Sequence, residues 1–348
     1  MNGSGEVLVF GAGSIGCYVG GCLQASGVPV QFVGRPRVLA LLRQHGLGLS
    51  DLGGTHHRLA PGALSLHEQL PQDLRPALVL LCVKSGATAD AAAQLGAALP
   101  AGTPLLSLQN GVSNAELAQR QAPRLRVLAG MVPFNVAELA DARFHRGTEG
   151  PLAAQDDPAL RPWVTRFAAA GLPLQLHADL RALQWGKLLL NLNNPVNALS
   201  GLPLRAQLLD RDYRRCTAAL IEEALGVLRA AGMAPARVTP LAPHLLLPLL
   251  RLPTPLFRLL AARMLRIDAQ ARSSMADDLR LGRRTEIDAL CGEVLRLAHS
   301  LGIGAPRNAR MVELIAAADR STRPGDGAAL RRALASVGPE RPAVGTAP

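Results

Sequence analysis

The fold is decided near the start of the chain by the sequence Gly11-Ala12-Gly13-Ser14-Ile15-Gly16. It follows an apolar run at residues 6–10, which predicts a buried strand, and it leads into residues 14–25, which predict a helix. In a turn of this kind Gly11 permits the tight bend, Gly13 lets the backbone approach a pyrophosphate, and Gly16 lets the helix pack closely on the strand. Ser14 and Ile15, at the start of the helix where the phosphate would sit, are candidate cofactor-binding residues together with the three glycines. The motif therefore predicts a dinucleotide-binding α/β unit.

Strands and helices continue to alternate through the first half of the chain. Further strands are expected at residues 28–33, 77–83, 103–108 and 125–131, and helices at 37–45, 88–99 and 114–120. This alternation is typical of βαβ units with a mostly parallel sheet. Near Asp179 the pattern changes, and apolar residues recur at helical spacing to about residue 318.

These patterns predict three parts. Residues 1–179 are expected to form a Rossmann-type dinucleotide-binding α/β domain, and residues 180–320 an all-α domain. Residues 321–348, rich in proline, glycine and alanine, are expected to be a disordered tail.

The end of the second expected strand distinguishes between two cofactors. A site for NAD usually has an acidic residue there, which binds the ribose 2′-hydroxyl. This chain instead has Gly34-Arg35-Pro36-Arg37. Arg35 suits a 2′-phosphate, with Arg37 as a helper, so NADPH is favoured over NADH. The alternative is that Arg35 is one more surface arginine in an arginine-rich chain.

The 348 residues carry a net charge of +11, but the kinds of basic residue that produce this charge are more informative than its value. Only two of the 37 basic residues are lysine, Lys84 and Lys187. A lysine can exchange a proton, which an arginine cannot easily do. The arginines are dispersed, aromatic residues make up 3% of the chain, and no nucleic-acid-binding motif accompanies them, so no nucleic-acid partner is expected.

Other features of the sequence exclude further classes. The N-terminus lacks the basic start of a secretory signal, and the apolar residues 241–265 are interrupted by prolines and arginines, so no membrane partner is expected. The longer segment 235–266 is typical of an amphipathic helical insertion. Its apolar residues are candidates for a subunit interface, so a homodimer is expected. Five cysteines without a C-x-x-C pair favour reduced thiols, a cytoplasmic location and no metal site.

Three groups of polar residues are candidates for a site. Lys84 and Asn110 each follow an expected strand, and the carboxyl ends of strands border the ligand crevice of such a sheet. In Trp185-Gly186-Lys187-Leu188-Leu189-Leu190-Asn191-Leu192-Asn193-Asn194-Pro195, helical spacing places Lys187, Asn191 and Asn194 on one face. The alternative is a solvated stripe with incidental asparagines.

Together these segments resemble the 2-dehydropantoate 2-reductase (ketopantoate reductase) family. The resemblance rests on GAGSIG at residue 11, LCVKS at residue 81, QNG at residue 109, WGKLLLNLNNPVNALSG at residue 185, and the block SSMADDL…GRRTEID over residues 273–288. It implies a Rossmann domain, a helical domain, NADPH, and a site in the cleft between them. The implied activity is the reduction of ketopantoate to pantoate, on the route to pantothenate and coenzyme A.

The resemblance also implies roles for individual residues. Lys187 would be the general acid that protonates the C2 ketone oxygen, and Glu286 would bind the hydroxyl side of the substrate. Asn191, Asn194 and Ser274 would be substrate contacts, with Ser274 near the carboxylate. Lys84 and Asn110 would lie near the nicotinamide and ribose.

Two departures from the family pattern bear on the substrate. Ala271 stands where an asparagine is expected, and Asn194 lies one residue short of a full further turn from Asn191. The first alternative, which Ala271 motivates, is therefore a reductase of another branched 2-keto acid. A separate alternative, from a different class, is a non-catalytic NADP-binding regulator. Ser273, Ser274 and Glu286 also have a structural alternative as residues of helix starts.

Overall fold

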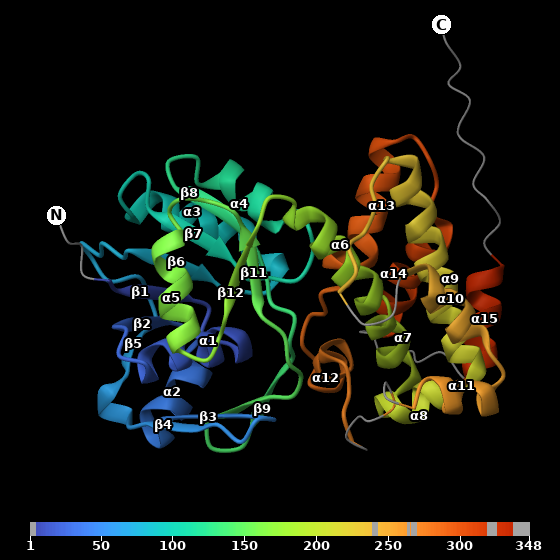
Figure 1. Cartoon of the computed structure of the whole chain (residues 1–348), viewed down its shortest axis with the longest axis horizontal. Helices are drawn as coiled ribbons and strands as arrows, with labels where there is room; N and C mark the ends of the chain where they lie inside the picture. The colour runs from blue at the N-terminus through green and yellow to red at the C-terminus, as the bar shows by residue number, and fades with distance from the viewer. Residues whose placement is uncertain (1–4, 239–242, 263–264, 266–269, 319–325, 337–348) are drawn as a thin grey trace, which may run out of the picture. The chain divides into compact units, whose positions relative to one another are not determined.

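The chain forms two compact units, Met1–Leu180 and Arg181–Pro348. The structure, a computed structural model, describes residues 5–238, 243–262, 265, 270–318 and 326–336. All the described strands belong to the first unit, and the described elements of the second unit are helices (Figure 1). This confirms the predicted fold class, an α/β domain followed by an all-α domain.

The first unit is built on a sheet of eight described strands in the order β12-β11-β8-β7-β6-β1-β2-β5 (Figure 1). Neighbouring strands run parallel except β8 and β11, which are antiparallel. The bounds are β1 Val7–Phe10, β2 Val30–Val33, β5 Ser65–His67, β6 Leu78–Leu81, β7 Pro104–Ser107, β8 Arg126–Met131, β11 Leu152–Gln155 and β12 Leu174–His177.

The central strands are the uninterrupted apolar runs of the sequence. All residues of β1 and β6 are buried, as expected for strands covered on both faces. In the register, Phe10 of β1 lies beside Val33 of β2 and Leu81 of β6, so the carboxyl ends of three strands meet at one edge. The helices and 3₁₀ turns of this unit are α1 Ser14–Ala25, α2 Pro36–His45, η1 Pro61–Ala63, η2 Ser85–Ala87, α3 Thr88–Ala98, α4 Asn114–Gln121 and α5 Arg161–Ala169.

A second sheet, which no pattern in the sequence indicated, packs on α1. Its order is β4-β3-β10-β9, with bounds β3 Leu47–Asp51, β4 His56–Leu59, β9 Val136–Leu139 and β10 Arg143–Arg146. Glycines let α1 approach both sheets closely. A Cβ on Gly20 would lie 2.6 Å from Val9 Cγ2, and one on Gly21 would lie 2.6 Å from Leu47 Cδ2. The helix is therefore enclosed between the two sheets.

The second unit is organised around α9, the longest described helix. The bounds of the helical elements are α6 Leu180–Asn191, α7 Asn193–Ser200, α8 Leu204–Leu209, α9 Arg211–Ala230, α10 Pro243–Arg251, α11 Thr254–Leu260, α12 Ser274–Arg280, η3 Ile287–Ala289, α13 Cys291–Ser300, α14 Pro306–Ala318 and α15 Gly327–Ala335. Helices α7, α8, α10, α13, α14 and α15 contact α9.

Arg214 of α9 is fully buried and joins the ends of neighbouring helices. Its guanidinium donates to the carbonyls of Leu208 (2.9 Å), Leu250 (3.1 Å) and Leu252 (2.7 Å). The same group lies 4.2 Å from the centroid of the Phe257 ring. Carbonyls at helix C-termini carry partial negative charge, so they stabilise a buried cation.

Helix α15 corrects part of the predicted disordered tail, and the rest of that tail, residues 321–325 and 337–348, lies outside the described residues. Within residues 321–348, the segment Gly327–Ala335 is helical, with Asp326 accepting a hydrogen bond from the Ala329 amide at its start. Leu330 and Leu334 are buried against α9, and Arg331 pairs with Asp212 at 2.8 Å. The composition of this segment resembles that of a disordered tail, but the spacing of Leu330 and Leu334 is that of an amphipathic helix.

Part of the predicted insertion at 235–266 lies outside the described residues. The described part contains α10 and α11, and exposed leucines on these helices are Leu245, Leu256, Leu259 and Leu260. The homodimer stays a prediction. Among the described residues, no helix combines the length and apolar character needed to cross a bilayer, and no His, Cys, Asp and Glu cluster is suited to a metal ion.

Candidate active site

The turn between β1 and α1 has the geometry that its glycines require. Gly11 has a φ of +110°, and a Cβ there would lie 2.6 Å from the Val83 amide nitrogen. A Cβ on Gly16 would collide with the Gly11 carbonyl oxygen and lie 2.9 Å from Val9 Cγ1. Gly11 therefore permits the bend and Gly16 permits the close packing of α1 on β1.

The N-terminus of α1 is suited to an anion. Gly13 occupies the cap position without a side chain, and a Cβ there would meet no atom within 4 Å. The first turn contains no acidic residue, and the first intrahelical bond runs from the Cys17 amide to the Gly13 carbonyl at 2.8 Å. The amides of Ser14, Ile15 and Gly16 precede that bond, so they and the helix dipole would hold a pyrophosphate.

Arg35 lies beside this turn. The Val33 carbonyl at the end of β2 accepts from the amides of both Gly11 and Ala12 at 2.9 Å, which joins the two segments. Arg35 follows as the exposed cap residue of α2. Arg37, considered as a helper, is paired with Glu138 of β9 at 3.1 Å. Of these two arginines, Arg35 is thus the stronger candidate for a 2′-phosphate.

Lys84 and Asn110 lie on loops that the structure joins. Leu81 of β6 is the register partner of Ser107 of β7, and each loop begins just after one of these residues. The Ser85 hydroxyl donates to the Asn110 carbonyl at 3.1 Å. Both Lys84 and Asn110 are partly buried.

Beneath these loops lies a group of buried polar side chains that sequence reasoning missed. Gln109 Nε2 donates to Thr88 Oγ1 at 2.6 Å, and Thr88 Oγ1 donates to Asn114 Oδ1 at 2.9 Å. Ser107 Oγ donates to Gln109 Oε1 at 2.9 Å. All four residues are buried. Gln109 belongs to the QNG motif, whereas Thr88 and Asn114, at the starts of helices, resemble ordinary capping residues in the sequence.

In the second unit, Lys187 and Asn191 lie one turn apart on α6. The helix ends at Asn191, and α7 begins at Asn193. Pro195 has no amide hydrogen to donate to the Asn191 carbonyl, four residues before it, which explains the break. The predicted single stripe of Lys187, Asn191 and Asn194 is therefore divided between two helices.

The environment of Lys187 changes its acidity. The residue is partly buried on a helix whose other side is leucine-rich. Burial lowers the pKa of Lys187 to about 8, and the negative charge of Glu286 acts in the opposite direction. Glu286 directly precedes η3 and is also partly buried. The structure thus brings these two predicted residues into electrostatic contact across a long stretch of chain.

The two serines at the start of α12 have different surroundings. Ser273 is the helix cap: its hydroxyl accepts from the Ala276 amide at 3.2 Å and donates to the Asn194 carbonyl at 3.2 Å. Ser274 is exposed in the first turn of the helix. The capping alternative thus applies to Ser273 and leaves Ser274 as the candidate contact.

Other asparagines near Lys187 have structural partners. Asn197 is fully buried; its amide nitrogen donates to the Leu202 carbonyl and its oxygen accepts from the Ser273 amide, both at 2.9 Å. Asn193 exchanges hydrogen bonds with Gln207 on α8. Asn191 and Asn194 are partly buried at the end of one helix and the start of the next.

Comparison with known proteins assigns the family. Residues 7–158 match the family model for ketopantoate reductase PanE/ApbA, and residues 179–319 match the model for its C-terminal part. The chain belongs to the ketopantoate reductase family. The family is one of oxidoreductases that bind a nicotinamide dinucleotide. Helix α15 lies beyond the residues matched by either model.

Individual relatives align with this chain over most of its length. A 2-dehydropantoate 2-reductase of Halobacterium salinarum is 28% identical over 322 residues, which cover 90% of this chain and 99% of the relative. A crystal structure of a ketopantoate reductase from Ralstonia eutropha is 28% identical, with a TM-score of 0.75 and coverage of 91% and 99%. A D-mandelate dehydrogenase with NADH and anilino(oxo)acetate is 17% identical, with a TM-score of 0.75 and coverage of 91% and 98%, and so shares the fold.

Proposed function

We propose that this ketopantoate reductase family member reduces 2-dehydropantoate to pantoate with NADPH, as a step toward pantothenate. The observation that carries the proposal is Lys187, a partly buried lysine under the influence of Glu286 and one of only two lysines in an arginine-rich chain. The free cysteines and the absence of a C-x-x-C pair support a cytoplasmic location.

Lys187 is the proposed general acid. With its pKa lowered to about 8, the ammonium is mostly protonated at neutral pH yet donates more readily than an ordinary lysine. When bound, the dinucleotide supplies a hydride for the C2 carbon. Lys187 gives its proton to the ketone oxygen, and its charge stabilises the oxygen as negative charge develops there. An arginine would supply the charge but would hardly release a proton.

Glu286 and three polar residues are proposed to orient the substrate. The Glu286 carboxylate accepts a hydrogen bond from the substrate hydroxyl and supports the charged form of Lys187. Asn191 and Asn194 offer amide groups at the junction of α6 and α7. Ser274, exposed in the first turn of α12, contacts the carboxylate.

The first unit is proposed to hold NADPH. Gly11, Gly13 and Gly16 shape the turn, and the amides from Ser14 to Gly16 hold the pyrophosphate. Arg35 binds the 2′-phosphate, supported by its place beside the glycine turn. Lys84 and Asn110 contact the nicotinamide and ribose.

The deciding experiment measures the oxidation of NADPH in the presence of ketopantoate, with NADH in parallel. Turnover with both ketopantoate and NADPH is expected. The same assay with a panel of other branched 2-keto acids tests the alternative substrate, which Ala271 and the displaced Asn194 favour. If ketopantoate is no better than simple analogues, the named substrate is wrong; if no keto acid is reduced, the proposed activity is wrong.

A further inference from the structure

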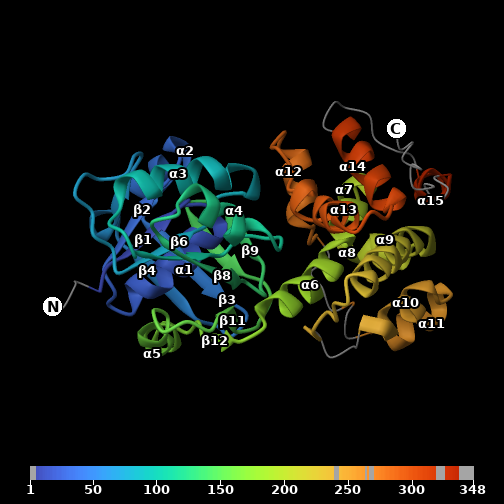
Figure 2. The same ribbon diagram turned by 90° about the horizontal axis from the view of Figure 1, so that it is seen from above.

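The polar side chains beneath the loops of Lys84 and Asn110 form one continuous series of hydrogen bonds. It begins at Ser107 on β7, passes through Gln109 to Thr88 at the start of α3, and reaches Asn114 at the start of α4. Helices α3 and α4 lie side by side (Figure 2). The series thus joins the end of β7 to the starts of α3 and α4.

Donors and acceptors are used consistently along this series. The Gln109 oxygen accepts from Ser107 while its nitrogen donates to Thr88, whose hydroxyl in turn donates to the Asn114 oxygen. Thr88 is fully buried, and Ser107, Gln109 and Asn114 are nearly so. Buried polar groups are costly unless they are paired, so this arrangement fixes the orientation of both side-chain amides.

The series ends on the backbone of a predicted cofactor-binding residue. Asn114 Nδ2 donates to the Asn110 carbonyl at 2.5 Å, and the Ser85 hydroxyl donates to the same oxygen at 3.1 Å. The next residue, Gly111, has a φ of +97°. On the neighbouring loop, the Ala87 amide donates to the carbonyl of Lys84 at 2.8 Å. Two donors on one carbonyl hold the peptide after Asn110 in a single orientation.

We propose that Thr88, Gln109 and Asn114 are positioning residues that hold the Lys84 and Asn110 loops for the nicotinamide half of the dinucleotide. The inference rests on the proposed function, because it takes Lys84 and Asn110 as the nicotinamide contacts. The glycine turn and Arg35, proposed for the pyrophosphate and the 2′-phosphate, follow β1 and β2. None of the hydrogen bonds of this series reaches them, so the series is expected to support the nicotinamide half of the ligand rather than the adenosine half.

The experiment compares two ligands, measured by equilibrium binding without substrate. NADPH contains the nicotinamide, whereas adenosine 2′,5′-bisphosphate ends before it. The Thr88→Val variant keeps the size of the side chain but removes its donor and acceptor. We expect its Kd for NADPH to rise about tenfold or more, because two buried amides lose their partner. Its Kd for adenosine 2′,5′-bisphosphate should stay unchanged.

Two further variants control for a general effect on folding. Thr103→Val removes the hydroxyl of a buried residue just before β7, at the amino ends of the strands and away from the predicted site. This hydroxyl donates to the Pro100 carbonyl at 2.7 Å, and its loss should leave both Kd values unchanged. Thr88→Ser restores the hydroxyl and should recover most of the NADPH affinity. If Thr88→Val does not fold, Ser85→Ala is the substitute, because the partly buried Ser85 hydroxyl donates to the Asn110 carbonyl. We again expect a higher Kd for NADPH and an unchanged Kd for adenosine 2′,5′-bisphosphate.

The outcomes separate this inference from the proposed function. Equal weakening of both ligands, or no weakening of NADPH in the folded variant, would overturn the positioning role. A wild-type protein that binds NADPH but does not reduce ketopantoate contradicts the proposed reaction and leaves the positioning role testable. A wild-type protein that binds neither ligand contradicts both.

Discussion

Lys187 is the residue whose replacement separates catalysis from cofactor binding. We expect Lys187→Ala to lower kcat/KM by about 10²–10⁴-fold, the usual contribution of a positioned general acid. Its Kd for NADPH should not change, because the proposed dinucleotide contacts lie in the first unit. Steady-state kinetics and equilibrium binding measure the two quantities. Unchanged turnover would exclude Lys187 as the acid and would leave a different donor to be found.

The acidity of Lys187 predicts how activity depends on pH. Burial lowers its pKa to about 8, and only the protonated form donates. We therefore expect kcat/KM for reduction to be level below about pH 8 and to fall by about tenfold per pH unit above it. Glu286 raises this pKa, so Glu286→Gln should make the decline begin at lower pH. A decline at the same pH in both proteins would contradict the influence of Glu286.

Arg35 decides the preference between the two dinucleotides. Removing a charged hydrogen-bond partner costs about 1.5–3 kcal/mol, so Arg35→Ala should raise the KM for NADPH by about 10- to 100-fold. The KM for NADH, which has no 2′-phosphate, should change little. Arg37→Ala is the matched control, because Arg37 is paired with Glu138. Equal losses for NADPH in both variants would show a general effect of positive charge.

At the scale of elements, α6 is held by a close backbone approach next to Lys187. A Cβ on Gly186 would collide with the Ala236 carbonyl oxygen, and the Ala236 amide donates to the Ala182 carbonyl at 2.8 Å. The segment after α9 therefore lies directly against α6. A side chain at position 186 would separate the two.

Gly186→Ala is accordingly expected to destabilise the protein by about 1–3 kcal/mol, since overpacking outweighs the gain in helix propensity. Gly226→Ala on α9 is the matched control, because a Cβ there would meet no atom within 4 Å. It should be neutral or stabilise the protein by up to about 1 kcal/mol. Denaturant unfolding curves compare the two. Similar midpoints would contradict the close approach at Gly186.

Elements also show what local sequence patterns can and cannot predict. Strands β1, β2, β6, β7 and β8 and helices α1 to α4 were predicted closely, because apolar runs and helical spacing are local properties. The other strands of the main sheet, β5, β11 and β12, and helix α5 were not predicted. The second sheet was missed, since its short strands such as β4 are largely exposed and lack an apolar run. Helix α15 was missed because its composition resembles that of a disordered tail.

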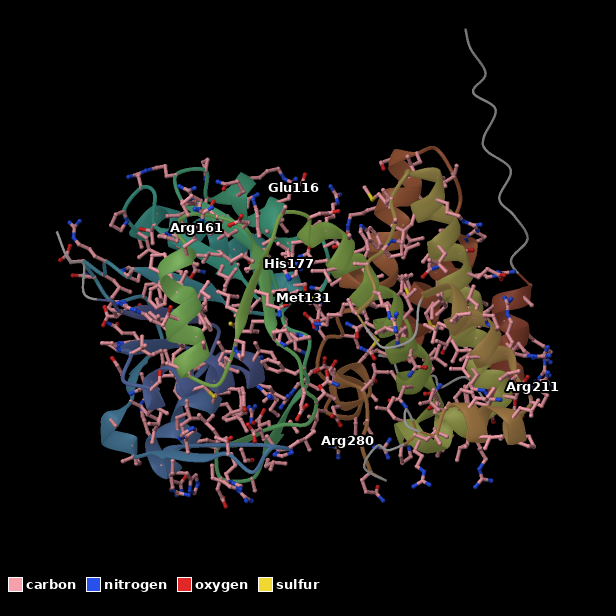
Figure 3. The ribbon with its side chains drawn as sticks, viewed as in Figure 1. Glu116, Met131, Arg161, His177, Arg211 and Arg280 are labelled. Carbon is pink, nitrogen blue, oxygen red and sulfur yellow. The ribbon has the colours of Figure 1, made fainter. Side chains whose placement is uncertain are left out.

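At the scale of the whole molecule, the charge of +11 comes mainly from arginines that are spread along the whole sequence. Arg161, Arg211 and Arg280 are exposed on three different helices (Figure 3). Many arginines are also paired with carboxylates; described pairs include Arg43–Glu68, Arg120–Glu116, Arg126–Asp157, Arg251–Glu222 and Arg331–Asp212. This distribution differs from the continuous basic track typical of nucleic-acid-binding proteins.

We therefore expect no retention of the protein on immobilised duplex DNA at physiological salt. Dispersed and paired arginines release few counterions, so any binding at low salt should disappear as the salt concentration rises. Chromatography across a salt series measures this directly. Retention that persists at physiological salt would mean that the positive charge has a nucleic-acid partner after all.

The sequence by itself determined the glycine turn, the alternation of strands and helices, the helical second half and the unusual place of two lysines. These depend on neighbouring residues and on the short-range rules of backbone geometry. Only the tertiary structure decided that Glu286 acts on Lys187, that Asn193 and Asn197 have structural partners, and that Thr88 joins Gln109 to Asn114. Each of these relations joins residues far apart in the chain, and their burial sets both the pKa of Lys187 and the cost of an unpaired amide.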